Sequence, residues 1–367
     1  MEFNVERGTF QEGVQKTLGI VERKTTMPIL NNILIRAGDN SVTIIATDRE
    51  IGLVARYDAN VTIPGEITVA ARKLHEMIRE TQDDTINFKK LENNWVTITC
   101  GKVVYRLPGL AAEEFPEVSD EADMAFSRIR CDVLREMINK TFFAISTDEM
   151  RVSLNGVYFR QDNGSVVMVA TDGHRLSIAK KPTEGETLSD IDGIIIPRKG
   201  VGEIRKLVED GSEHVEVGIG QGVCVVKKND TVLRVSLIDA EYPDYHKVIP
   251  EQQGVEVSLN KDQILHSLRR MSVISSERFS GVKITLEADK MILTSTNPDI
   301  GEARDEIDIS YSGKEFEMGY NVKYLIDAID VIADKEISLE MREAHGPSVI
   351  REIGSEGYMC IIMPLRL

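Results

Sequence analysis

The sequence predicts an α+β protein built from three tandem copies of one domain. A small residue, a threonine and an Asx end an apolar, alternating run three times, at Ala46-Thr47-Asp48, Ala170-Thr171-Asp172 and Ser295-Thr296-Asn297, about 124 residues apart. This period is far longer than the 20–50 residues of a solenoid unit, so it indicates whole repeated domains. The chain has 367 residues, which gives each copy the size of a self-sufficient domain.

Each copy is expected to contain two helices and several strands. Helix patterns precede the repeated threonine at 10–21, 133–145 and 263–274, and follow it by some 25 residues at 71–78, 197–204 and 321–329. Strand pairs that suggest hairpins are 94–100 with 103–107, 222–227 with 232–236, and 349–352 with 358–362. Because strands follow strands more often than they alternate with helices, we expect antiparallel sheets.

The domain boundaries are expected where this pattern breaks into charge and turn formers. Acidic, proline-containing stretches occupy 113–121 and 241–254, in equivalent places of the first two copies. The predicted domains are therefore 1–125, 126–253 and 254–367.

Composition indicates an ordinary globular protein, with 42% apolar and 28% charged residues. The amino terminus lacks a basic segment followed by an apolar run, and 18 uncharged apolar residues never follow one another, so we expect a cytoplasmic protein without a membrane partner. Cys100, Cys131, Cys224 and Cys360 lie far apart, mostly within apolar runs. Buried thiols are therefore expected, without a zinc site or a disulfide framework.

The net charge of −16 argues at first against a nucleic-acid partner. The six helix candidates, taken as 6–24, 71–80, 130–148, 197–208, 260–270 and 321–335, nevertheless sum to +6, which leaves −22 on the remaining residues. Mildly basic helices beside an acidic remainder fit a protein that meets a polyanion on one surface only. The alternative is that helices simply favour lysine and arginine.

Catalytic motifs are sparse. The glycines of 218–222 have the wrong spacing for a dinucleotide loop, and the absence of a P-loop pattern excludes nucleotide hydrolysis of that type. Asp172 and His174 could move protons or bind a metal, but their counterparts in the other copies keep the Asx and lose the histidine, which favours a turn. We therefore expect no catalytic residue, metal or cofactor, and the repeats alone suggest a binding scaffold.

Five ordered motifs over the whole chain carry a family resemblance. They are 27–32 (MPILNN), 170–176 (ATDGHRL), 196–200 (IPRKG), 242–245 (YPDY) and 363–367 (MPLRL). In order and spacing they resemble motifs of the bacterial DNA polymerase III beta subunit family, the beta sliding clamps. The two alternatives to a clamp are an enzyme that uses Asp172 and His174, and an interaction scaffold that does not encircle DNA.

The resemblance implies a non-catalytic processivity factor of DNA replication. Two chains would associate head to tail as a ring-shaped homodimer, with antiparallel sheets outside and two helices per domain inside. The ring would encircle duplex DNA without reading its sequence. Other implied partners are DNA polymerase subunits that carry clamp-binding peptides, an ATP-dependent clamp loader, and further replication and repair proteins.

The resemblance also implies three sets of site residues. Those expected to face DNA are Arg23, Lys24, Arg72, Lys73, Arg198, Lys199, Arg205, Lys206, Arg269 and Arg270. Those expected in a groove for partner peptides are Leu154, Thr171, Gly173, His174, Arg175, Leu176, Pro243, Lys247, Val248, Phe279, Tyr324, Ile362, Met363, Pro364, Leu365 and Arg366. Those expected at the dimer interface are Tyr105, Leu107, Val273 and Ile274.

Overall fold

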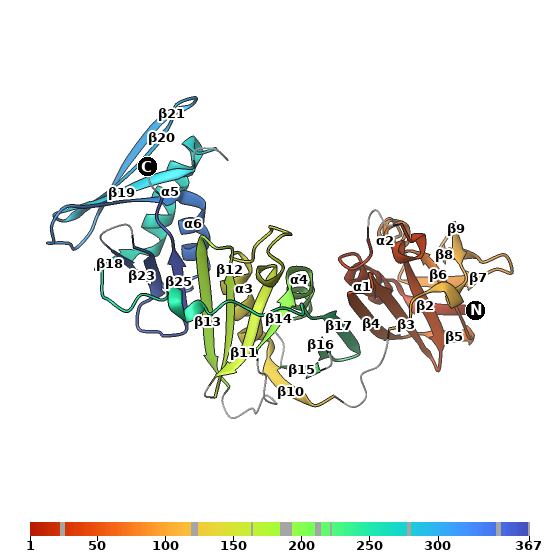
Figure 1. Ribbon diagram of the computed structural model, residues 1–367. Helices are drawn as coiled ribbons and strands as arrows, with labels where there is room; N and C mark the ends of the chain where they lie inside the picture. The colour runs from red at the N-terminus through yellow and green to blue at the C-terminus, as the bar shows by residue number, and fades with distance from the viewer. Residues whose placement is uncertain are drawn as a thin grey trace. The chain divides into compact units, whose positions relative to one another are not determined.

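The computed structural model describes residues 1–22, 26–118, 124–162, 164–183, 193–209, 214–220, 222–276, 280–342 and 346–365 (Figure 1). Contacts group them into two compact units. The first unit contains 1–131 and 202–237, and the second contains 132–201 and 238–367. Among the described residues, no helix combines the length and the apolar character needed to span a bilayer.

The same order of elements occurs three times. The first copy contains β1 (Glu2–Glu6), α1 (Arg7–Thr17), β2 (Asn32–Gly38), β3 (Ser41–Thr47), β4 (Ile51–Asp58), β5 (Asn60–Ile63), β6 (Gly65–Ala70), α2 (Ala71–Arg79), β7 (Thr85–Lys90), β8 (Trp95–Cys100) and β9 (Val103–Leu110). The second contains β10 (Phe126–Arg130), α3 (Cys131–Phe142), β11 (Gly156–Asp162), β12 (Ser165–Thr171), β13 (Arg175–Pro182), β14 (Ile194–Pro197), α4 (Arg198–Leu207), β15 (His214–Gly220), β16 (Val223–Lys228) and β17 (Thr231–Ser236). The third contains β18 (Val255–Asn260), α5 (Lys261–Ile274), β19 (Gly281–Glu287), β20 (Lys290–Asn297), β21 (Gly301–Asp308), β22 (Phe316–Asn321), α6 (Val322–Asp330), β23 (Glu336–Met341), β24 (Ser348–Glu352) and β25 (Tyr358–Ile362). The predicted pattern of two helices per copy is confirmed.

The last strand of one copy joins the sheet of the copy before it. In the first unit the sheet order is β10-β15-β16-β17-β4-β3-β2-β6-β9-β8-β7-β1-β5, and β17 pairs with β4 antiparallel. In the second unit the orders are β14-β11-β12-β13-β25-β24-β23-β18 and β21-β20-β19-β22, and β25 pairs with β13 antiparallel. Two successive copies therefore share a continuous sheet at each junction.

Aromatic and aliphatic side chains fill the core beneath the helices. In the first unit Phe3 stacks on Phe88 with 5.0 Å between ring centroids, and Phe10 of α1 packs edge-on against both. In the second unit Tyr320 and Tyr358 are fully buried and each hydroxyl has a partner, with 2.6 Å to the Ser348 hydroxyl and 2.9 Å to the Ala328 carbonyl. Partnered hydroxyls let these large rings enter the core without an unsatisfied polar group.

The repeated Asx forms the same turn in all three copies. Asp48 accepts hydrogen bonds from the amides of Glu50 and Ile51, at 2.9 and 2.6 Å. Asp172 accepts from the amides of His174 and Arg175, at 2.9 and 3.0 Å. Asn297 accepts from the amide of Asp299 at 3.0 Å. The turn interpretation is therefore confirmed, since each side chain caps its own backbone.

A buried lysine joins the second and third copies. Lys140 of α3 is 1% exposed, and its Nζ lies 2.6 Å from carboxylate oxygens of both Glu136 and Glu352. The ammonium also lies over the Tyr358 ring, 5.4 Å from its centroid. Glu352 belongs to β24 and is itself buried, so a charge from each copy is desolvated in one network.

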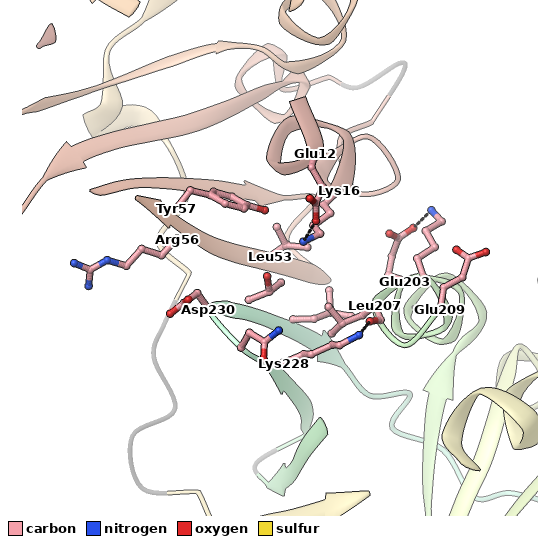
Figure 2. Close-up of a pocket in the computed structure, with 14 residues that line it drawn as sticks. Glu12, Lys16, Leu53, Arg56, Tyr57, Glu203, Leu207, Glu209, Lys228 and Asp230 are labelled. Carbon is pink, nitrogen blue, oxygen red and sulfur yellow. Dashed lines mark hydrogen bonds and ion pairs between the residues drawn. The ribbon is translucent and has the colours of Figure 1, made fainter. Parts of the chain in front are cut away.

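The equivalent position at the first junction is open. Lys16 lies 124 residues before Lys140 and pairs with Glu12 at 2.8 Å, but the two side chains are 34% and 64% exposed. They line a cavity of about 530 Å³ between α1, β4, β17 and α4, with Leu53, Leu207 and Leu233 among its apolar residues (Figure 2). Lys228, which lies 124 residues before Glu352, donates to the Leu207 carbonyl at 2.8 Å. The two junctions thus share a backbone arrangement and differ in what fills them.

We expect the variant Lys140→Ala to destabilise the second unit by about 3–5 kcal/mol, because it leaves Glu352 buried without its cation. The matched variant Lys16→Ala should change stability by less than about 1 kcal/mol, because its ion pair is exposed to solvent. Urea unfolding followed by circular dichroism measures both. Equal effects of the two variants would contradict a stabilising role for the buried network.

Candidate partner-binding and DNA-facing sites

Arg175, one of the residues predicted for the peptide groove, is held by several partners. Its Nε lies 3.1 Å from Asp172 Oδ2, its Nη1 lies 2.6 Å from Asp327 Oδ2, and its Nη2 donates to the Phe143 carbonyl at 2.6 Å. The guanidinium also stacks between the rings of Phe143 and Tyr324, at 5.0 and 4.4 Å from their centroids. With its side chain 10% exposed, Arg175 positions its neighbours and offers few donors to a ligand.

The surface beside Arg175 combines residues from the turn, α6 and the carboxyl terminus. The His174 ring stacks near Tyr324 with 6.3 Å between centroids, and burial raises the pKa of the Tyr324 hydroxyl. The Met363 amide donates to the His174 carbonyl at 2.9 Å, and the Leu365 amide donates to the Gly319 carbonyl at 2.8 Å. Predicted groove residues from distant parts of the sequence therefore meet here.

Apolar residues form the base of this region. Leu176 is 3% exposed and clusters with Tyr245 and Ile361, while Ile362 is fully buried in β25. Thr171 Oγ1 donates to the Arg175 carbonyl at 2.6 Å and accepts from the Gly173 amide at 3.1 Å, which closes the turn above them. Leu176 and Ile362 therefore shape the base of the region, whereas Met363 and Leu365 are exposed.

The segment after β17 contributes a polar margin. Pro243, Lys247 and Val248 are exposed around the short 3-10 helix Tyr245–Val248. Hydrogen bonds from His246 and then Lys247 lower the pKa of Asp244. Leu154, in the 3-10 turn Val152–Leu154, is half-buried, and Pro364 is also partly exposed. Phe279 and Arg366 lie outside the described residues.

Two of the predicted DNA-facing arginines bind backbone carbonyls of the protein itself. Arg72 Nη2 donates to the Leu18 carbonyl at the end of α1, at 3.1 Å. Arg198 Nη1 donates to the Ile145 carbonyl at 3.0 Å and stacks over the Phe142 ring at 4.6 Å. Burial, followed by the nearby charge of Arg175, lowers the pKa of Arg198. Both guanidinium groups cap the loop after the first helix of their copy, which is a structural role.

The other predicted DNA-facing cations are more exposed, and several have acidic neighbours. Lys73 lies 2.6 Å from Glu76, Lys206 lies 2.7 Å from Glu203, and Arg269 lies 2.8 Å from Asp330. Arg270 pairs with Asp305 of β21. Lys199 and Arg205 are exposed on α4, and Arg23 and Lys24 lie outside the described residues. These acidic neighbours weaken the positive field of the helices.

The predicted dimer residues divide into buried and accessible ones. Leu107 is only 6% exposed, which places its side chain in the core of the first copy. This orientation does not support its assignment to the interface. Tyr105 and Ile274 are half-buried, and Val273 is 75% exposed. The adjacent Val103 and Val104 are 41% and 56% exposed, and the sequence reasoning missed them. Val103 and Val104, at the start of the same strand, therefore offer more accessible apolar surface than Leu107 does.

Three family descriptions cover nearly the whole chain. The DNA polymerase III beta subunit N-terminal, central and C-terminal domains match residues 1–119, 128–244 and 246–366. The chain belongs to the DNA polymerase III beta subunit family. It therefore consists of three tandem clamp domains, and its function is that of a non-catalytic sliding clamp.

Curated and structural relatives agree with this membership. The chain is 33% identical to the beta sliding clamp of Caulobacter vibrioides over 376 residues, with 100% of both chains covered. It matches the Pseudomonas aeruginosa DNA polymerase III subunit beta with a TM-score of 0.93 and 28% identity over 100% of both chains. It matches the DNA polymerase sliding clamp of Bacillus subtilis with a TM-score of 0.94 and 28% identity, covering 100% of this chain and 99% of that one.

The sequence did not reveal what holds Arg175. Asp327 and the Phe143 carbonyl lie 152 and 32 residues away from it, and neither belongs to a recognisable motif. Asp172 accepts hydrogen bonds from its own turn and from Arg175, which supports the turn interpretation of this residue over a catalytic one.

We expect Arg175→Lys to destabilise the second unit by about 1–3 kcal/mol, because lysine cannot replace the three guanidinium hydrogen bonds together. The control Arg151→Lys alters an exposed arginine that donates to the Asp172 carbonyl at 3.1 Å, and it should change stability by less than about 0.5 kcal/mol. Urea unfolding tests both variants. A neutral Arg175→Lys would show that the network does not hold the site together.

Proposed function

We propose that two copies of this chain close head to tail around duplex DNA and hold DNA polymerase subunits beside it. The domains would be 1–125, 126–253 and 254–367, and the protein would act in the bacterial cytoplasm. Partners would include clamp-binding peptides of polymerase subunits, other replication and repair proteins, and an ATP-dependent loader that opens the ring. Family membership supports the clamp, and the surface of His174, Tyr324 and Met363 supports the peptide groove.

Unpaired strand edges support ring closure. Among the described residues, 103–107 of β9 pair with β8 alone, because β6 pairs with β9 only at Gly109 and Leu110. β21 is the terminal strand of its sheet. Exposed edges invite pairing with another chain, and pairing between unlike edges of two copies can close a ring without starting a filament. Val104 and Val273 would supply apolar contact near this joint.

Weak, distributed charge supports sliding. Exposed lysines and arginines on the helices would meet phosphates, which carry no sequence information. Their acidic neighbours limit the strength of each contact, so retention would depend on the closed ring and little on affinity.

We expect the double variant Lys199→Gln and Arg205→Gln to weaken binding of the dimer to a short linear duplex and to reduce the slope of log affinity against log salt by about 1–2. Lys89→Gln is the control, because Lys89 lies on β7 and pairs with Glu2 away from the helices. Fluorescence anisotropy across a salt series measures the slope. Arg198→Ala should act mainly on stability, because Arg198 binds the Ile145 carbonyl. An unchanged slope in the double variant would remove these residues from the DNA surface.

We expect deletion of residues 363–367 to abolish binding of a synthetic peptide that copies the clamp-binding segment of the cognate polymerase. The deletion removes Met363 and Leu365 from beside His174 and Gly319 but keeps all of β25. Anisotropy with the labelled peptide measures binding, and analytical ultracentrifugation checks that the variant remains dimeric. Normal peptide binding by the truncated dimer would refute the groove.

A further inference from the structure

The cavity at the first junction lies where Tyr358 fills the second junction. Thr231 pairs with Ala55 across β17 and β4, and Tyr358 pairs with Ala179 across β25 and β13. Because Ala179 follows Ala55 by 124 residues, the period of the repeat, Thr231 occupies the place of Tyr358. Both alanines are fully buried, and Thr231 is 6% exposed and lines the cavity. The first junction therefore has a threonine where the second has an aromatic ring.

The neighbouring strand pair does not fill the space that this exchange leaves. Leu53 pairs with Leu233 beside Thr231, where the second junction pairs Ser177 with Cys360. Both leucines are buried and larger than their counterparts, so they give the cavity an apolar floor. A volume of about 530 Å³ nevertheless remains.

Tyr57 and Lys16 form one wall of this cavity. The Tyr57 ring lies against α1, where a Cβ on Gly13 would come within 2.6 Å of it. The Lys16 ammonium lies 5.7 Å from the centroid of that ring, and Figure 2 shows it pointing toward Leu53. Apolar side chains beside an ammonium suit an aromatic ring, because its face attracts the cation and its carbon atoms pack against leucine.

The charges around the cavity balance one another, which favours a neutral ligand. Lys16 pairs with Glu12 at 2.8 Å, and Lys206 pairs with Glu203 at 2.7 Å. An anion would meet as many carboxylates as cations, so its net attraction would be small. The charged lining residues are Lys16, Arg56, Lys206 and Lys228 with Glu12, Glu203, Glu209 and Asp230.

We propose that this cavity binds a neutral aromatic ring the size of a tyrosine side chain, seated where Tyr358 lies at the second junction. There the Lys140 ammonium lies 5.4 Å from the centroid of the Tyr358 ring, and both side chains are buried. The bound ring would lie beside Lys16 in the same way. The volume falls within the range of about 300–1,000 Å³ typical of ligand pockets. This site is separate from the proposed peptide groove and does not rest on it.

The test uses the full-length protein and 4-fluorophenol, with binding followed by fluorine NMR. Thr231→Tyr supplies the ring from the chain itself, and Lys16→Met keeps the aliphatic stem but removes the ammonium. Thr97→Tyr is the matched control for the first variant, because Thr97 lies on β8 and does not line the cavity. Lys89→Met is the control for the second, because Lys89 pairs with Glu2 outside the cavity.

We expect 4-fluorophenol to bind the parent with a Kd of about 1 mM or tighter, as a fragment of this size can. Binding should be about fivefold weaker to Lys16→Met and lost in Thr231→Tyr, whereas both controls should bind like the parent. Lys16→Met decides the outcome if Thr231→Tyr does not fold. Equal binding by the parent and Lys16→Met would overturn the proposal, as would no binding by the parent below about 10 mM.

Two competitors identify the chemistry and the source of the ring. p-Cresol should displace 4-fluorophenol, and 4-methylcyclohexanol, which lacks a π face, should do so at least about tenfold more weakly. Equal competition by these two compounds would contradict an aromatic site. The peptide acetyl-Gly-Tyr-Gly-amide then separates the sources. Tighter competition than p-cresol would assign the ring to a side chain of a partner protein, and weaker competition would assign it to a free aromatic compound.

Discussion

The last strands of the second and third copies pair with the sheet of the copy before them. The other features of the structure depend on this pairing. β17 lies beside β4, and β25 lies beside β13. Backbone hydrogen bonds cannot be left unmade in a buried sheet, so this pairing fixes the register of each junction. That register brings the Asx turn of one copy, the proline-containing linker and the following strand to the same place, and the proposed peptide groove lies at the second of these junctions.

The two junctions use the same backbone for different chemistry. The second is filled by Lys140, Glu352 and Tyr358, and its turn carries Arg175 in a network of three partners. The first has a partly exposed Lys16 with a cavity beside it, and Arg234 pairs with Gly52 where the second junction has Ile361 paired with Leu176. Duplication of a domain preserves hydrogen-bonded geometry more strictly than side-chain identity, because the backbone groups must always be paired.

Much of the fold could be predicted because its signals are local and repeated. The threonine-Asx turns, the two helices of each copy and the hairpin strands all follow from residue type and spacing within short windows. Side-chain roles were harder to predict. The family resemblance implied that Arg72 and Arg198 face DNA, yet the guanidinium of each donates to a backbone carbonyl of its own chain, at Leu18 and Ile145. The resemblance likewise implied an interface role for Leu107, but its side chain is buried within its own domain. Such roles depend on contacts between distant segments, which spacing alone does not reveal.

The central claim is that the chain holds DNA by encirclement and not by affinity, and retention on circular DNA tests it most directly. The dimer would be loaded on a nicked plasmid by its cognate loader with ATP, washed at high salt, and the plasmid then cut once. The account predicts that protein remains on the circle and leaves when the plasmid is linearised. Protein that is lost at high salt before the cut, or that stays bound to the linear product, would contradict encirclement.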